Sequence, residues 1–215
     1  MDDYLSEREQ WELLKVWLRE NGIWIIASVA LAAAGVWAVR WWQERTESQA
    51  MEASVKYESI LDAFDKGDRT RALTLIGEMS RQHPKSPYND QAQLVEARVY
   101  VQNGQLDKAA ANLRGVMDKS ADPQLALVAR LRLARVQLAL NKPDDALASL
   151  SGAKQPGEFA ARYQEARGDI LLAKGDKAAA LKEYRQAQGA AVRGALDSEL
   201  LELKIKDLAD EAPEK

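Results

Sequence analysis

The chain has 215 residues, no cysteine and one histidine, with 30 lysine and arginine residues against 33 acidic ones for a net charge of −3. These counts exclude disulfides and thiol chemistry and leave no excess of positive charge for nucleic acid. The single histidine, His83, precedes Pro84 at an expected helix end, so histidine-based metal clusters and a Ser-His-Asp triad are not expected. No phosphate-binding glycine loop occurs. We predict a protein that is not an enzyme and takes no metal, cofactor or small-molecule substrate.

The first predicted element is a membrane-spanning helix near the N-terminus. Residues 22–39 carry no charge, and all six tryptophans fall within the first 42 residues. An indole ring has an apolar body and one N–H donor, so tryptophans collect where hydrocarbon meets lipid headgroups. A helix from Trp24 to Trp41 rises about 26 Å, close to the ~30 Å hydrocarbon thickness of a bilayer. We predict an N-terminal segment at 1–21 and a transmembrane helix at 22–42, with interfacial anchors at Trp24, Trp37, Trp41 and Trp42.

Three other interpretations of this apolar run fit the residues less well. A cleaved signal peptide begins with a short basic region, whereas the residues ahead of the run form a long, net acidic segment. Its small-residue triplet Ala30-Leu31-Ala32 also lies inside the apolar run rather than after it. A buried soluble helix or an amphipathic surface helix would carry a polar face at helical spacing, and none interrupts this run.

A stripe of small residues follows one face of the span, at Ala27, Ala30, Ala34 and Ala38. Small side chains let helix backbones approach closely in lipid, so the stripe predicts a docking face for another membrane helix. Alanine is also common in such segments, and the sequence alone leaves both interpretations open.

The side of the membrane is less clearly encoded. Arg8, Lys15 and Arg19 precede the span, while Arg40 and Arg45 follow it. The positive-inside rule therefore favours a cytoplasmic N-terminus only weakly. We expect residues 1–21 in the cytoplasm and the rest of the chain on the opposite side of the membrane.

The remainder of the chain predicts an all-α repeat array. Four short turn segments recur at 66–72, 103–109, 141–146 and 174–180, and in each a turn residue stands five positions before an alanine. The turn residues are Gly67, Gly104, Asn141 and Gly175, separated by 37, 37 and 34 positions. A period in the mid-thirties is typical of stacked helix–turn–helix units. The alternative is a helical bundle whose spacings agree by chance.

We expect these units to form an α-solenoid domain over residues 43–210. The units are predicted at about 50–86, 87–122, 123–156 and 157–190, followed by a capping helix at 194–209 and a frayed tail at 211–215. The apolar residues expected on the capping helix are Leu196, Leu200, Leu203 and Leu208. No linker rich in glycine, proline or serine follows the span, so we expect the array close to the membrane surface.

The repeat pattern is built on small residues at fixed positions. One lies seven positions before each of the last three turns, at Ala97, Ala134 and Gly168, and an alanine lies in each second helix, at Ala72, Ala109, Ala146 and Ala180. Small residues are expected where two helices cross closely. Together with Tyr100 and with Pro84 closing the first unit, this pattern resembles the tetratricopeptide repeat. The tryptophan and leucine of that consensus are mostly absent from the first helices, so the repeats are divergent.

Stacked repeats of this kind present a concave surface formed by their first helices. Transferring that geometry gives the candidate groove residues Leu94, Arg98, Val101, Leu131, Arg135, Leu138, Glu165, Asp169 and Leu172. Apolar residues beside a few charges suit an extended or partly unfolded peptide, or a helix of a partner protein. Leu94 and Leu131 also fit ordinary core positions, which we favour for them, and Arg98 and Arg135 are the preferred groove contacts.

Four segments are informative as a set: an acidic N-terminal region ending in ENG (20–22), RWW (40–42), LRLARVQLAL (131–140) and ARGDILLAKGDKAAALKEYRQA (166–187). Together they resemble the YfgM-type ancillary subunits of the bacterial Sec translocon. The resemblance implies an anchor in the inner membrane of Gram-negative bacteria and a tetratricopeptide-like domain in the periplasm. It implies two partners, the SecYEG channel and the membrane-anchored periplasmic chaperone PpiD, and assigns no contact residues.

Two functions fit these observations. The first is a non-enzymatic accessory subunit of the Sec translocon, which binds a partner chaperone or emerging, unfolded secretory chains through its groove at the inner membrane. The second is a membrane-anchored scaffold for another envelope-assembly complex, using the same groove. Membrane lipid is an expected contact of the anchor in both.

Overall fold

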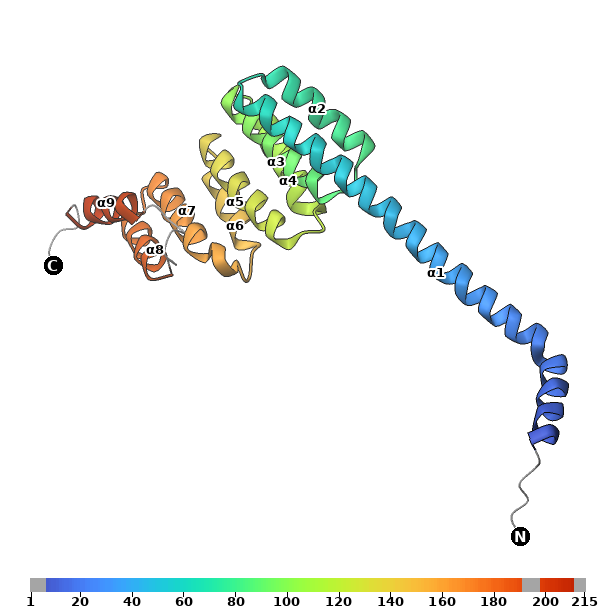
Figure 1. The fold of residues 1–215 in the computed structure, drawn as a ribbon. Helices are drawn as coiled ribbons and strands as arrows, with labels where there is room; N and C mark the ends of the chain where they lie inside the picture. The colour runs from blue at the N-terminus through green and yellow to red at the C-terminus, as the bar shows by residue number, and fades with distance from the viewer. Residues whose placement is uncertain (1–6, 191–197, 211–215) are drawn as a thin grey trace, which may run out of the picture. The chain divides into compact units, whose positions relative to one another are not determined.

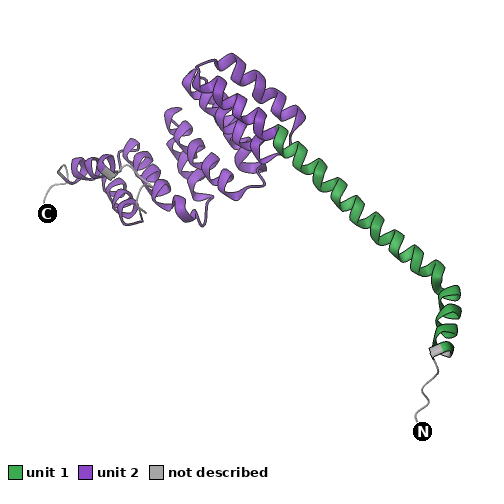
Figure 2. Cartoon of the chain, in the orientation of Figure 1, with its two compact units in different colours: residues 1–52 green, residues 53–215 purple. Residues whose placement is uncertain are grey.

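The computed structural model describes residues 7–190 and 198–210, and every secondary-structure element within these ranges is helical (Figure 1). In chain order the elements are α1 (Glu7–Asp65), α2 (Arg69–Gln82), α3 (Pro87–Gln102), α4 (Leu106–Lys119), α5 (Pro123–Ala139), α6 (Pro143–Ser151), the short 3₁₀ helix η1 (Gly157–Phe159), α7 (Ala160–Ala173), α8 (Lys177–Ala190) and α9 (Ser198–Asp210). The chain divides into two compact units, residues 1–52 and 53–215 (Figure 2). The expected tail at 211–215 lies outside the described residues.

The first unit consists of the greater part of α1, and it contains the expected membrane span. Among the described residues, α1 is the one helix long and apolar enough to cross a membrane, judged by length and composition. The apolar stretch is exposed along its whole length, and the exposed fraction of the anchor tryptophans runs from 52% at Trp41 to 74% at Trp24. Apolar side chains on every face of a helix are expected where lipid is the solvent. Residues 7–21, expected ahead of the span, belong to the same helix.

The second unit stacks helix pairs in chain order, as the change of colour from teal to red along the ribbon shows (Figure 1). The last turns of α1 pack with α2, and α3 with α4, α5 with α6, and α7 with α8 form the pairs that follow. Each first helix also contacts the next, as α3 does with α5 and α5 with α7. The α-solenoid expected from the 37-residue spacing is therefore the architecture of this unit.

The four predicted turn residues all adopt the left-handed conformation that ends a helix. Their φ angles are +77° at Gly67, +70° at Gly104, +57° at Asn141 and +84° at Gly175. Glycine has no Cβ to clash at positive φ, and asparagine tolerates it better than most residues. The residue after each turn can then donate back to the last helical turn, as Gln105 N does to Tyr100 O at 2.8 Å. The turn prediction is confirmed at all four positions.

The helices that follow begin where sequence rules expect them to begin. Proline occupies the first turn of α3, α5 and α6, where its missing N–H leaves no hydrogen bond unmade. Side-chain oxygens cap free backbone N–H groups, as Asp68 does for Arg71 N at 3.0 Å and Asp122 does for Gln124 N at 2.8 Å. Local chemistry thus fixes most of the helix boundaries in this unit.

The small residues lie at the helix crossings. All four alanines in the first turn of the second helices, Ala72, Ala109, Ala146 and Ala180, are completely buried. The small residues of the first helices are buried as well, with Ala97 at 2% and Ala134 at 0% exposure. A Cβ added at Gly168 would lie 2.3 Å from a ring carbon of Tyr184, so α8 approaches α7 too closely there for any larger residue. The prediction that close crossings require small side chains is confirmed.

Four hydrophobic clusters, each shared by neighbouring helices, hold the stack together. Ile60, Ile76 and Met79 belong to the first, and Leu94, Leu113 and Leu133 to the second. The third includes Leu131, Leu150, Tyr163 and Ile170, and the fourth includes Tyr184, Leu201 and Leu208. Helix α5 contributes Leu133 to one cluster and Leu131 to the next, so its opposite faces join two successive pairs.

The capping helix differs in part from its prediction. Helix α9 begins at Ser198, and residues 194–197, including Leu196, lie outside the described residues. Leu201 and Leu208 are buried against α8, whereas Leu200 and Leu203 are 47% and 52% exposed. Two apolar stripes run along this helix, and sequence periodicity could not say which of them faces α8.

Candidate binding surface on the first helices

The nine predicted groove residues are apolar, acidic or basic, and each of these three groups has different surroundings in the structure. Leu94 and Leu131 are only 6% and 5% exposed, and half-buried Leu138 packs against the same cluster as Leu131. Leu94 and Leu131 therefore do not line a groove, and their inclusion among the candidate groove residues is corrected. They lie near the middle of their helices, where the neighbouring pair covers them. Val101 and Leu172, near the last turn of their helices, remain 41% and 37% exposed.

The acidic residues of the predicted groove are engaged by the capping helix. Lys204 of α9 donates to Glu165 at 2.9 Å and to Asp169 at 2.7 Å, and the hydroxyl of Tyr184 donates to Asp169 at 2.8 Å. Burial alone would lower the pKa of Lys204, but the two carboxylates outweigh it and raise that pKa. Burial and the bond to Asp169 raise the pKa of Tyr184. Glu165 and Asp169 therefore help to attach α9.

The basic residues make weaker contacts with the rest of the chain. The guanidinium of Arg98 lies over the ring of Phe64, 4.8 Å from its centroid. Arg135 Nη2 lies 3.8 Å from Glu165 Oε2, beyond direct hydrogen-bond distance, while Lys204 binds that carboxylate more closely. Both predicted arginines thus keep most of their hydrogen-bonding capacity.

A third arginine, Arg132 of α5, lies near Arg98 and Arg135. Burial lowers the pKa of Arg132, and the nearby charges of Arg98 and Arg135 lower it further. The Arg132 guanidinium makes no hydrogen bond or ion pair with any residue that the structure describes. We call Arg98, Arg132 and Arg135 the arginine cluster. The three-residue spacing of Arg132 and Arg135 was the sequence signal that both share one face of α5, and sequence reasoning did not use it.

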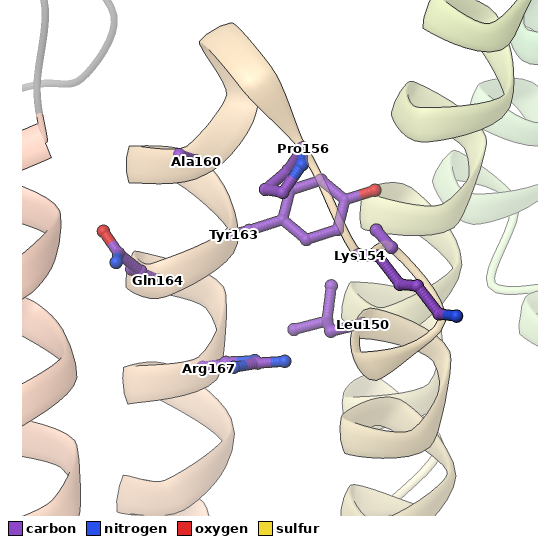
Figure 3. Close-up of a pocket in the computed structure, with 8 residues that line it drawn as sticks. Leu150, Lys154, Pro156, Ala160, Tyr163, Gln164 and Arg167 are labelled. Carbon is purple, nitrogen blue, oxygen red and sulfur yellow. The ribbon is translucent and has the colours of Figure 1, made fainter.

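A small hollow lies between α6 and α7 (Figure 3). Its volume is about 220 Å³, and its lining is Leu150, Ala153, Lys154, Pro156, Ala160, Tyr163, Gln164 and Arg167. Arg167 extends from α7 toward α6, whereas Gln164 points away from Leu150 (Figure 3). The hydroxyl of Tyr163 is already bonded to Leu127 O at 2.8 Å. Ligand pockets are usually ~300–1,000 Å³, and no three metal-ligating side chains come together among the described residues.

The family comparison covers most of the chain. The model of the tetratricopeptide repeat-like domain matches residues 15–210. A protein of Aggregatibacter actinomycetemcomitans named ancillary SecYEG translocon subunit is 34% identical over 204 residues, which is 95% of this chain and 98% of that protein. The protein of the same name from Escherichia coli strain K12 is 32% identical over 209 residues, covering 97% of this chain and 100% of that one.

Solved structures agree on the fold. The crystal structure of BtubC (BKLC) from P. vanneervenii matches with a TM-score of 0.59 at 17% identity, covering 76% of this chain and 83% of that one. A tetratricopeptide repeat protein from Parabacteroides merdae matches with a TM-score of 0.54 at 16% identity, covering 73% of this chain and 57% of that one. At this level of identity the likeness concerns the fold alone.

Proposed function

This chain belongs to the tetratricopeptide repeat-like family of ancillary SecYEG translocon subunits, and on that premise we propose that it is a non-enzymatic accessory of the SecYEG channel. The resemblance found in the sequence is thereby confirmed. The near full-length match carries the proposal, because it includes both the apolar span and the repeat domain. Neither part alone would distinguish a translocon subunit from other anchored repeat proteins.

In this proposal the span of α1 crosses the inner membrane, with residues 1–21 in the cytoplasm and the repeat domain in the periplasm. Exposure of the apolar stretch along its whole length supports the crossing. The excess of basic residues ahead of the span supports the orientation weakly. The alanine stripe from Ala27 to Ala38 is the face proposed to contact a membrane helix of the channel.

The repeat domain would receive partners on its first helices. Exposed Val101 and Leu172 provide apolar contacts there, and the arginine cluster provides charge. Such a mixture suits a chaperone of the PpiD type or an emerging secretory chain, since apolar contacts supply affinity and polar contacts supply register.

The test is photo-crosslinking in living cells at native expression. A crosslinking amino acid replaces Ala34 in the span, or Val101 or Leu172 in the repeat domain. Arg114, exposed on the second helix α4, is the matched control. We expect channel subunits as adducts from Ala34, and chaperone or secretory chains as adducts from Val101 and Leu172 but not from Arg114.

Two results would count against the proposal. Purification in mild detergent without any channel subunit would remove the translocon assignment. One fixed, folded envelope protein captured at Val101 and Leu172, with no channel adduct from the span, would instead favour the scaffold function for another envelope-assembly complex.

A further inference from the structure

The positive charge of the arginine cluster is only partly balanced by carboxylates of neighbouring residues. Arg98 faces an aromatic ring, Arg132 makes no hydrogen bond or ion pair with a described residue, and Arg135 has only the distant carboxylate of Glu165. Lys204 already forms an ion pair with that carboxylate at 2.9 Å, so its negative charge is only partly available to Arg135. The three guanidiniums therefore leave a local excess of positive charge on adjacent helices α3 and α5.

Placing like charges together on folding has a cost that something else must offset. Each guanidinium raises the electrostatic energy of the other two. The lowered pKa of Arg132, caused by burial and then by Arg98 and Arg135, reports that unfavourable environment. An incoming anion relieves the repulsion and gains charge-assisted hydrogen bonds at the same time.

Apolar groups border the cluster. The ring of Phe64 lies under Arg98, and exposed Val101 is one helical turn beyond it on α3. Tyr57 belongs to the same neighbourhood, since burial raises the pKa of Tyr57 while the charge of Arg132 opposes that rise. Arginine beside aromatic and aliphatic groups is the composition of interface positions that dominate binding energy.

We propose that the arginine cluster docks an extended acidic segment of a partner protein, in which two or three aspartate or glutamate residues lie next to an apolar residue. The carboxylates would accept paired hydrogen bonds from the N–H groups of the guanidiniums, and the apolar residue would cover Phe64 and Val101. This inference deepens the proposed function and rests on it, because it names the chemistry of the partner that the repeat domain receives.

A membrane surface is the competing source of negative charge. Phosphate groups of lipid would be recognised by the same guanidiniums, but the ring of Phe64 and exposed Val101 lie next to Arg98. An acidic segment that carries an apolar residue contacts both the charges and these apolar groups, whereas the phosphates of lipid headgroups contact the charges alone.

The experiment uses the full chain in neutral phosphatidylcholine nanodiscs and a fluorescent twelve-residue peptide that contains glutamate, aspartate and phenylalanine. Its twin carries glutamine and asparagine in place of the acids. Fluorescence anisotropy measures both affinities for the wild type, for R98Q/R132Q/R135Q, and for R81Q/R114Q/R185Q. The last variant removes the same charge from exposed arginines of the second helices α2, α4 and α8.

We expect the acidic peptide to bind at least about tenfold more tightly than its twin, which is about 1.4 kcal/mol. The cluster variant should lose about tenfold in affinity and the control variant less than twofold. The variant R98K/R132K/R135K keeps the charge without the planar fork, and should lose about threefold. Wild-type affinity should also fall as sodium chloride rises from 50 to 500 mM.

Equal binding of the acidic peptide by wild type and cluster variant would overturn the inference. So would a cluster variant that loses adhesion to phosphatidylglycerol vesicles but retains the peptide. Circular dichroism identifies a misfolded variant, and in that case the lysine variant and the salt series decide. Copurification of the wild-type chain with channel subunits is measured separately. If no channel subunit copurifies, the proposed function is wrong. If channel subunits copurify but peptide binding does not depend on the arginine cluster, only the docking inference is wrong.

Discussion

Replacing Gly168 with alanine should destabilise the C-terminal part of the repeat domain, although alanine is the better helix former. The added Cβ would lie 2.3, 2.5 and 3.0 Å from three ring carbons of Tyr184, where about 3.5–4.0 Å is normal. The ring has no room to retreat, since Tyr184 is 0% exposed and its hydroxyl is bonded to Asp169 at 2.8 Å.

The magnitude follows from two opposing contributions. Overpacking of a core costs about 1–3 kcal/mol, and three overlaps against a fixed ring favour the upper end. Alanine recovers about 1 kcal/mol relative to glycine inside a helix. The net loss should be about 2 kcal/mol, which lowers the melting temperature by about 4–8 °C for a domain of this size.

Urea unfolding of the full chain in detergent, followed by far-ultraviolet circular dichroism, measures this loss. Tryptophan fluorescence is unsuitable, because all six tryptophans lie within the first 42 residues. Gly115→Ala is the matched control, because nothing lies within 4 Å of a Cβ added there in the middle of α4. That variant should gain about 0.5–1 kcal/mol.

A double-mutant cycle isolates the overlap. Tyr184→Ala alone should cost about 3–5 kcal/mol. In that background Gly168→Ala should become neutral or stabilising, since the obstructing ring is gone. The reasoning is refuted if Gly168→Ala stabilises the wild type as Gly115→Ala does, or if its cost is unchanged without the ring.

Three further predictions concern a turn, the capping helix and a buried tyrosine. Gly175→Ala should cost about 1–2 kcal/mol in urea unfolding although its surroundings are open, because φ is +84° there, and Gly175→Asn should cost less; equal losses would contradict this. Lys204→Gln should cost about 2 kcal/mol and speed amide exchange in α9, whereas exposed Lys206→Gln should not; unchanged exchange would mean that Leu201 and Leu208 hold α9 without the ion pairs. Burial raises the pKa of Tyr163 to about 12, above the value near ~10 of an unfolded tyrosine. The stability that this raised pKa contributes is complete below pH ~10 and is lost as pH rises toward ~12, by up to about 1.4 kcal/mol per pH unit. Unfolding curves for wild type and Tyr163→Phe at several values between pH ~10 and ~11 should therefore converge, and a constant gap between them would refute this.

Features governed by local rules were predictable from the sequence. Positive φ at Gly67, Gly104, Asn141 and Gly175 follows from which residues tolerate that conformation. Burial of the small residues follows from the close approach that helix pairs require. The period between turns then determines the repeat architecture without any knowledge of long-range contacts.

Features that depend on how one pair covers the next were not predictable. Periodicity placed Leu94 beside Arg98 on one face, but stacking buries the leucine and leaves the arginine in solvent. The four leucines expected on the capping helix were only partly right for the same reason, since Leu208 is buried in the cluster with α8 whereas Leu200 is 47% exposed and Leu201 is buried in its place. The ion pair between Glu165 and Lys204 joins residues 39 positions apart, and no sequence motif predicts it.

The separation of the hydrophobic core into four clusters has a consequence for how the domain comes apart. Each cluster is confined to consecutive helices, so cooperativity passes from pair to pair and is weakest at the two ends. We expect the C-terminal end to open while the pairs that carry the arginine cluster stay folded, with α5 as the boundary between them. Damage near Gly168 should therefore spread toward α9 and spare the surface formed by α3 and α5.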